Sequence, residues 1–248
     1  MATDAVITAV SRKPVYRPVN RTLERAFYLG MAVLMCVCVY IGFSPTYFGA
    51  GMLRAPLPSP ILHVHGAVFT FWMLLFTAQA ALVSAGNVKL HRKLGTVAFC
   101  LPPVMIVLGV VAAVDALRRG VQIGPLDPAT SFAIPAIGLI GFVIVIYASW
   151  KTRRQPDAHK RLILIATAGL VEAAFGRFPW AKLGLPPAAG ALTGLGILIL
   201  LIIIYDLVSL HRIHRATMWA APLTFVVNAA AVPIGMTAAW HSFAAMLK

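Results

Sequence analysis

The sequence has few acidic side chains and few charges of any kind. Among its 248 residues only 11% are charged, with seven Asp and Glu against 21 Lys and Arg, while 60% are hydrophobic. A soluble domain usually carries about 25% charged residues, so this composition excludes an ordinary water-soluble fold. Lipid must solvate part of so apolar a chain. The net charge of +14 does not call for a nucleic-acid partner, because most of the positive charge flanks apolar runs.

Cysteine is also scarce. Cys36, Cys38 and Cys100 all fall inside apolar runs, without CxxC spacing. We therefore expect small buried residues rather than redox or metal sites. Residues 1–25 hold five basic residues and no compact apolar core, which argues against a cleavable signal peptide and predicts a basic tail.

Seven apolar stretches each approach the roughly 20 residues that a helix needs to cross a bilayer. The connections between them are short and rich in Pro, Gly and Asn, so we expect one domain over residues 26–248. The sequence predicts an all-α, polytopic bundle of about seven helices. The expected spans are 26–44, 62–84, 94–115, 132–150, 162–180, 191–210 and 218–240.

The placement of Lys and Arg predicts the orientation. With the N-terminus in the cytoplasm, 15 of the 21 basic residues fall on the inner side: Arg12, Lys13, Arg17, Arg21, Arg25, Lys89, Arg92, Lys93, Lys151, Arg153, Arg154, Lys160, Arg161, Arg212 and Arg215. This asymmetry follows the positive-inside rule and puts the C-terminus outside. Trp150 and Trp219 at inner boundaries, and Trp180 and Trp240 at outer ones, fit interfacial belts. The short basic loops are typical of a bacterial inner-membrane protein.

Polar groups at membrane depth are costly, so they are candidate functional residues. Those expected inside the bundle are Glu172, Asp206, Gln79, Asn228 and Arg177. Glu172 lies about ten residues into its span and needs a partner, a cavity or a proton. Arg177 follows five residues later, a poor spacing for a direct pair with Glu172.

The seven histidines fall into two sets on this topology. His63, His65 and His241 are expected near the outer face, and His91, His159, His211 and His214 near the inner face. His65 leads a helical stripe through Phe69, Trp72, Phe76 and Gln79, whereas His63 lies on nearly the opposite side. Three of the inner histidines each precede a basic residue just before a span, in His91-Arg92, His159-Lys160 and His214-Arg215. This rhythm fits either a repeated helical hairpin or a cationic collar at anionic headgroups.

Imidazoles at the ends of adjacent membrane helices suit axial ligation of haem iron or a His–carboxylate metal site. The outer candidates are His65, His63 and His241, with Asp115 or Glu172 as oxygen ligands. The inner candidates are His91, His159 and His214 or His211, with Asp206 as an acceptor behind them.

One stretch carries a resemblance. His63-Val-His65-Gly66, a span ending near Gln79, and Leu90-His91-Arg92-Lys93-Leu94-Gly95 together resemble the helical hairpin of b561-type membrane cytochromes. They are still more similar to an uncharacterised family of bacterial multi-pass proteins with an HR.LG turn, to which 157–162 and 205–207 are also similar. The likeness covers about 40 residues, and it implies a haem b site.

These patterns leave three functions open. The first is a haem- or metal-binding protein that moves electrons between quinol and a partner. The second is an accessory or structural subunit of a larger membrane complex, favoured by the minimal loops and the aliphatic run 197–204. The third is a small transporter or membrane hydrolase. A retinal protein is excluded, because every lysine lies at a boundary or outside a span.

Overall fold

The computed structural model describes residues 20–248, and this part of the chain is all-helical, as predicted. Its α-helices are α1 (Arg21–Phe43), α2 (Pro60–Ser84), α3 (Val88–Ala98), α4 (Leu101–Arg118), α5 (Pro128–Lys151), α6 (Pro156–Phe175), α7 (Pro187–Leu210), α8 (Arg215–Gly235) and α9 (Ala238–Ala245). Short turns η1 (Ser44–Phe48), η2 (Met52–Arg54) and η3 (Trp180–Leu183) lie in the connections. The basic tail predicted for 1–25 lies mostly outside the described residues.

Several helices begin at residues that satisfy their free amides. Asn20 caps α1 by accepting hydrogen bonds from the amides of Thr22 and Leu23, and Asp127 caps α5 through Ala129 and Thr130. Proline at the first position of α2, α5, α6 and α7 costs no hydrogen bond there.

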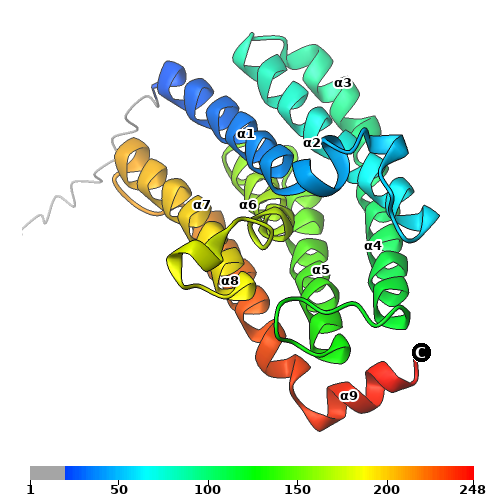
Figure 1. Ribbon diagram of the computed structural model, residues 1–248. Coiled ribbons are helices and arrows are strands. Elements are labelled where there is room, and N and C mark those ends of the chain that lie inside the picture. Colours follow the sequence, from blue (N-terminus) through cyan, green and yellow to red (C-terminus); the bar gives the residue numbers. More distant parts are fainter. Residues whose placement is uncertain (1–19) are drawn as a thin grey trace, which may run out of the picture.

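α5 and α6 form the centre of the bundle (Figure 1). α6 packs against α1, α5, α7 and α8, and α5 also packs against α4 and α8, while α2 lies between α1 and α4. Small residues allow the closest crossings: a Cβ on Gly42 of α1 would lie 2.5 Å from the carbonyl oxygen of Ala174 on α6. Such close backbone approach is typical of packed membrane helices.

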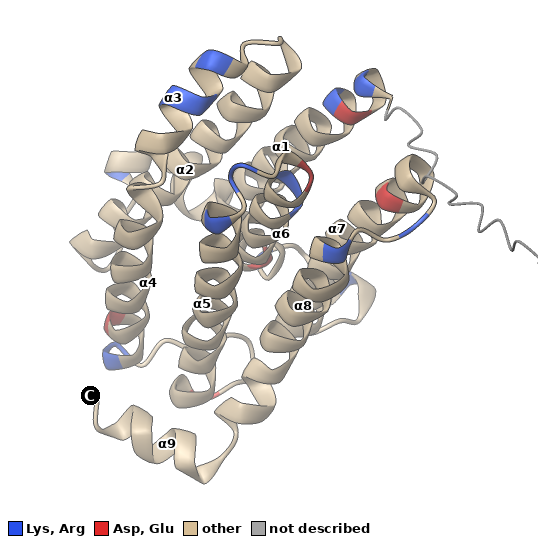
Figure 2. Cartoon of the chain, turned by 180° about the vertical axis from the view of Figure 1, so that it is seen from behind, with Lys and Arg blue, Asp and Glu red and all other residues tan. Residues whose placement is uncertain are grey.

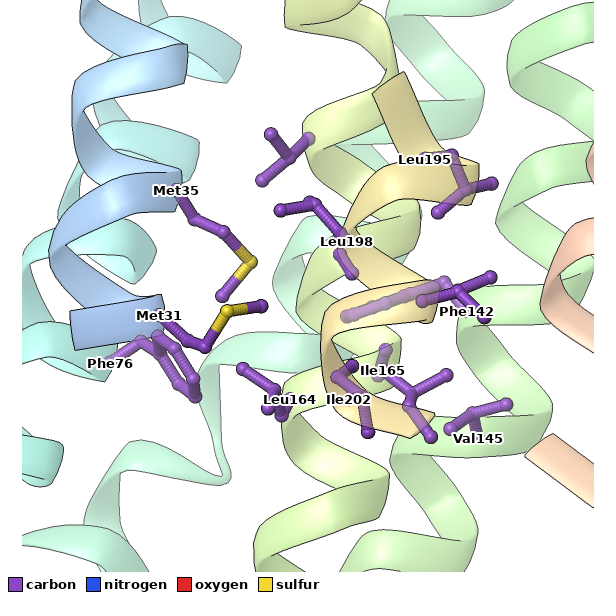
Figure 3. Packing of buried hydrophobic residues seen from close by; sticks show 14 of the residues in the cluster. Met31, Met35, Phe76, Phe142, Val145, Leu164, Ile165, Leu195, Leu198 and Ile202 are labelled. Carbon is purple, nitrogen blue, oxygen red and sulfur yellow. The ribbon is translucent and has the colours of Figure 1, made fainter. Parts of the chain in front are cut away.

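The interior between these helices is apolar (Figure 3). Met31 and Met35 of α1, Phe76 of α2, Phe142 of α5 and Leu164 of α6 all belong to one buried cluster. Trp72 and Phe76, which the sequence predicted on one stripe of the second span, are both buried there. At these two residues the stripe therefore faces the interior of the bundle.

Within residues 20–248 six helical segments are long and apolar enough to cross a membrane, so the chain is a multi-pass membrane protein in contact with lipid. They are Arg21–Phe48, Pro60–Ser84, Val88–Arg118, Pro128–Lys151, Pro187–Leu210 and Arg215–Gly235. The predicted span 162–180 is not among them. The corresponding helix α6 ends at Phe175 and carries Lys160, Arg161 and Glu172, charges that the other bundle helices surround.

Two further boundaries differ from prediction. The span predicted for 218–240 ends at Gly235, and Trp240 lies on the separate helix α9, because Thr237 caps a new helix through the amide of Trp240. The indole of Trp240 donates to the carbonyl of Ala129, which holds α9 across the start of α5. The predicted span 94–115 is divided between α3 and α4 at Phe99 and Cys100.

Most of the Lys and Arg positions coloured in Figure 2 lie at one end of the bundle, which we call the basic end. It contains the start of α1, the α2–α3 turn, the α5–α6 loop and the α7–α8 loop. Arg118 and Arg119 lie at the opposite end. The charge asymmetry read from the sequence therefore corresponds to two distinct ends of the folded bundle.

Candidate functional site at the basic end of the bundle

A buried ion pair joins α6 to α7. The Nε and Nη2 atoms of Arg161 lie 2.7 and 2.6 Å from Oδ1 of Asp206, with the two residues 1% and 0% exposed. Arg161 also donates through Nη1 to the carbonyl of Asp157, one turn earlier. The sequence predicted Asp206 as buried, and this is confirmed. It placed Arg161 only among the cytoplasmic cations before the fifth predicted span, whereas the guanidinium is buried and turns inward to this carboxylate.

The second oxygen of Asp206 binds α8. Its Oδ2 accepts hydrogen bonds from the hydroxyl of Thr217 at 2.6 Å and from the backbone amide of His214 at 3.0 Å. His211 ends α7 with φ of +54°, a left-handed conformation that turns the chain back toward the bundle. One carboxylate therefore fixes the ends of three helices.

An aromatic cluster from α1 and α7 covers this ion pair. The rings of Phe27 and Tyr205 stack at 4.0 Å, and Tyr28 meets Tyr205 edge-on at 5.4 Å. Beside them Lys160 bridges two carboxylates, at 2.8 Å from Glu24 and 2.6 Å from Asp157. These contacts attach α1 to the same polar cluster.

A cavity of about 710 Å³ opens beside the cluster, between the C-terminal end of α5 and the N-terminal ends of α6 and α8. Ala148, Leu162, Ala216, Met218 and Trp219 form most of its apolar wall. Its polar lining comes from Thr152, Gln155, Asp157, His214 and Arg215. The cavity thus combines an apolar wall with hydrogen-bonding groups and is the right size for a small ligand.

His214 is held in one tautomer at this cavity. Its Nδ1 accepts a hydrogen bond from the amide of Ala216 at 3.0 Å, so in the neutral ring the proton is on Nε2. Burial lowers the pKa of His214 and the charge of Arg161 lowers it further, although Asp206 and Asp157 act in the opposite direction. At neutral pH the side chain is therefore a hydrogen-bond donor through Nε2.

Asp157, the carboxylate in the lining of the same cavity, is a hydrogen-bond acceptor. Burial acts to raise the pKa of its carboxyl, but the hydrogen bond and charge of Lys160 outweigh it, and the pKa is lowered. The lining of the cavity accordingly offers a neutral donor at His214 and an anionic acceptor at Asp157.

His91 lies in a different corner, against α2. With the amide of Gln79 oriented to satisfy its neighbours, Gln79 accepts from the amide of Gly95 at 2.9 Å and donates to Nδ1 of His91 at 2.6 Å. This orientation makes Nδ1 an acceptor and puts the proton of His91 on Nε2. For Nε2 of His91 to bind iron, the side-chain amide of Gln79 must therefore flip, so that Nδ1 carries the proton and Nε2 is left with its lone pair.

His159 has the opposite tautomer. Its Nδ1 lies 3.0 Å from the carbonyl oxygen of Ser149 on α5, to which it donates, so the lone pair of Nε2 is free. His91 lies within electrostatic range of it, and the ring of Phe99 is 6.1 Å away. The ring contacts of the two histidines lie on different helices, at Gln79 of α2 for His91 and at Ser149 of α5 for His159.

The outer histidines are separated. His65 on α2 stacks on Phe69 at 4.1 Å, while Tyr47 donates to the carbonyl of His63. His241 on α9 lies 3.4 Å from the hydroxyl of Thr130 and 3.8 Å from Asp127. Asp115, proposed as an oxygen ligand, pairs with Arg119. Across residues 20–248 no three His, Cys, Asp or Glu side chains are grouped as a metal site.

The remaining predicted polar residues differ in environment. Glu172 and Asn228 are buried, 8% and 6% exposed, and Gln79 is partly buried. Arg177 is exposed, and its predicted burial is wrong: it lies beyond the end of α6, donates to the carbonyl of Ala173 and covers the ring of Phe43 at 4.2 Å.

Sequence reasoning missed Arg161, Thr217 and the cavity. Opposite charges at Arg161 and Asp206, near the same ends of consecutive predicted spans, were a signal for the ion pair. Nothing in the sequence indicated the cavity, because three helix ends create it. Comparison with protein-family models, with curated proteins and with solved structures found no match to this chain.

Proposed function

We propose that this protein takes part in electron transfer within a membrane, by binding a quinol or quinone in the cavity at the basic end. The observation that supports this proposal is one cavity of about 710 Å³ that combines an apolar wall with His214 and Asp157. A quinone has a flat apolar ring with two oxygens. Its carbonyl accepts from a donor such as Nε2 of His214, and the quinol hydroxyl donates to a carboxylate such as Asp157.

The position of the cavity supports a lipid-soluble ligand. Trp219 lies in the second turn of α8 and Trp150 near the end of α5, as interfacial belts require. The basic end then faces the cytoplasm, with the N-terminus inside and the C-terminus outside. In this proposal α6 also crosses the membrane, which raises the number of spans from six to seven, and its charges are buried by the neighbouring helices. The membrane is a bacterial inner membrane.

The test uses Trp219 as the reporter. Titrating the purified protein with a short-chain quinone should quench its tryptophan fluorescence with saturation, and Trp219→Phe should remove most of that saturable change. His214→Asn keeps an N-cap acceptor for Ala216 but loses the Nε2 donor, and should weaken binding about tenfold. The matched control is His211→Asn, since asparagine tolerates the left-handed conformation at that position.

Equal affinity in the His214 and His211 variants, or quenching without saturation, would contradict the quinone proposal. The accessory-subunit alternative predicts no saturable binding of quinone at all. Other membrane subunits remain partners in either case, because exposed apolar side chains such as Leu74, Val107 and Val208 suit lipid and partner helices equally.

Haem b is the second candidate, favoured by the free Nε2 of His159. An axial histidine usually donates its other ring nitrogen to a carbonyl, as His159 does to Ser149. His91 is the proposed second ligand, by the resemblance to b561-type cytochromes, once the side-chain amide of Gln79 flips. The outer histidines His65, His63 and His241 have contacts of their own and are not proposed as ligands here. The purified protein should show a Soret band that shifts on reduction and is lost in His159→Ala. Colourless protein after expression with haem supplied would exclude this candidate.

A further inference from the structure

Two carboxyl groups are buried in the bundle, and they differ in one respect. The carboxylate of Asp206 pairs with Arg161 and accepts hydrogen bonds from the hydroxyl of Thr217 and the backbone amide of His214. The carboxyl of Glu172 on α6 is also buried, but it forms no hydrogen bond or ion pair within residues 20–248. A buried carboxylate without a partner is strongly unfavourable, and protonation removes that cost. Glu172 has no evident role in holding helices together.

We propose that Glu172 is a proton-exchanging carboxyl inside the bundle, and that the buried face of α8 supplies the polar groups around it. This goes beyond quinone binding and does not depend on it. The step is an acid–base exchange: the O–H bond of the carboxylic acid breaks, the proton passes to water, and the carboxylate is left. No electron is transferred.

The facing helix carries polar groups at this level. Gly169, one turn before Glu172, packs against the methyl group of Thr224 on α8, from which a Cβ on Gly169 would lie 3.1 Å. The Thr224 hydroxyl is buried and has no hydrogen-bond partner in the described chain. Asn228, one turn further, donates to the carbonyl of Thr224 at 2.8 Å. A free hydroxyl and an amide thus lie on successive turns of α8, which packs against α6, and the amide oxygen of Asn228 faces Gly138 on α5.

No fixed charge competes for this proton. No charged side chain within residues 20–248 forms an ion pair with Glu172. The titratable and charged groups on the helices packed against α6 are Arg21, Glu24, Arg25, Tyr28, Cys36, Cys38 and Tyr40 on α1, Tyr147 and Lys151 on α5, Tyr205 and Asp206 on α7, and Arg215 on α8, after its N-cap His214. On its own helix Arg161 binds Asp206, and beyond the helix Arg177 binds the carbonyl of Ala173.

The buried face of α8 continues to the cavity. Thr217 lies two turns before Thr224 on the same face, about 10 Å along the helix. It hydrogen-bonds to Asp206, which also binds the amide of His214 at the cavity wall. Alanines fill the interval, so exchange between Glu172 and the cavity requires water between Thr217 and Thr224.

The test is labelling of the full-length protein in liposomes with dicyclohexylcarbodiimide, followed by peptide mass spectrometry. This apolar reagent adds a protonated carboxyl across its C=N bond, and the adduct rearranges to a stable N-acylurea without loss of atoms. Glu172 should be labelled at pH 6, and its labelling should fall about tenfold or more by pH 9. Asp206, equally buried but ion-paired, is the internal control and should stay unlabelled.

Glu172→Gln, which keeps the shape of the side chain, should abolish that label, and Asp115→Asn at an exposed pair should leave it unchanged. Three outcomes would overturn the proposal. They are no label on Glu172, labelling of Glu172 that does not change between pH 6 and pH 9, and labelling of Asp206 to the same extent. Protection of Glu172 by sodium but not by potassium would also overturn it, since the site would then bind a metal cation.

Discussion

Arg161 directs two nitrogens at a single oxygen of Asp206, Oδ1, at 2.7 and 2.6 Å. Oδ2 is thereby left for Thr217 and the amide of His214 on α8. Because each oxygen serves a different helix, the orientation of one carboxylate couples α6, α7 and α8. The same three helix ends surround or adjoin the proposed ligand cavity, so its shape depends on this pair.

Breaking the pair should be costly. Asp206→Asn leaves the Arg161 guanidinium buried without its counter-ion and should reduce the free energy of unfolding by about 3–5 kcal/mol. The matched control is Asp115→Asn, which breaks the half-exposed pair with Arg119 and should cost about 1 kcal/mol or less. Thermal unfolding of both variants in the same detergent measures the difference. Equal midpoints would show that the buried pair is dispensable.

Glycines on α1 should separate into required and replaceable positions. In Gly42→Ala the new methyl group would lie 2.5 Å from the backbone oxygen of Ala174, so α1 and α6 must move apart, at a cost of about 1–3 kcal/mol. Gly30 has no neighbouring atom within 4 Å of an added Cβ, and Gly30→Ala should be neutral or slightly stabilising. Thermal unfolding of the pair checks this. Similar losses at both sites would contradict the tight crossing.

The number of spans can be tested on either side of α6. Arg154 and Lys182 are exposed in the loops that precede and follow this helix. In a cysteine-free background, Arg154→Cys should be protected from a membrane-impermeant maleimide added to intact cells, whereas Lys182→Cys should be labelled. Permeabilised cells should label both, which controls for reactivity. If both positions react from the same side, α6 does not cross the membrane.

The end of the bundle opposite the basic end should be sensitive to acid. The hydroxyl of Thr130 donates to Asp127 and lowers the pKa of its carboxyl below 3.8, with help from the amides of Thr130 and Ala129. A lowered pKa stabilises the fold above pH 3.8 and loses that contribution as the pH falls through the folded-state value. Unfolding temperatures measured from pH 6 to pH 3 should fall more steeply in wild type than in Asp127→Asn, which still caps α5. Parallel curves would rule out this role.

Much of the fold could be predicted because its causes are local. Span positions follow from runs of apolar residues, and the stripe through Trp72 and Phe76 follows from helical spacing. The end of α6 was placed too late, since hydropathy continues past Phe175 while the helix stops at Gly176. Trp240 was placed in a span because a short helix lying across the bundle has the same composition as one that crosses the membrane.

The site was predictable only in part. His91, His159, His214 and Asp206 were singled out as residue types, but their tautomers depend on Gln79, Ser149 and Ala216, which come from other turns or helices. The sequence put Arg161 among the basic residues of a cytoplasmic loop, because basic residues at the end of a membrane helix normally lie there. The guanidinium lies inward because the side of α6 that carries Arg161 faces Asp206 on α7.

By itself, the sequence determined that this is an all-helical membrane protein with one basic end, because hydropathy and charge act on each segment separately. Only the tertiary structure decided which buried charges have partners. Within residues 20–248 Asp206 meets Arg161 and Glu172 meets no cation, since partnership depends on how helices are rotated against one another. That rotation is set by contacts such as Gly42 with Ala174 and Gly169 with Thr224, between residues far apart in the chain.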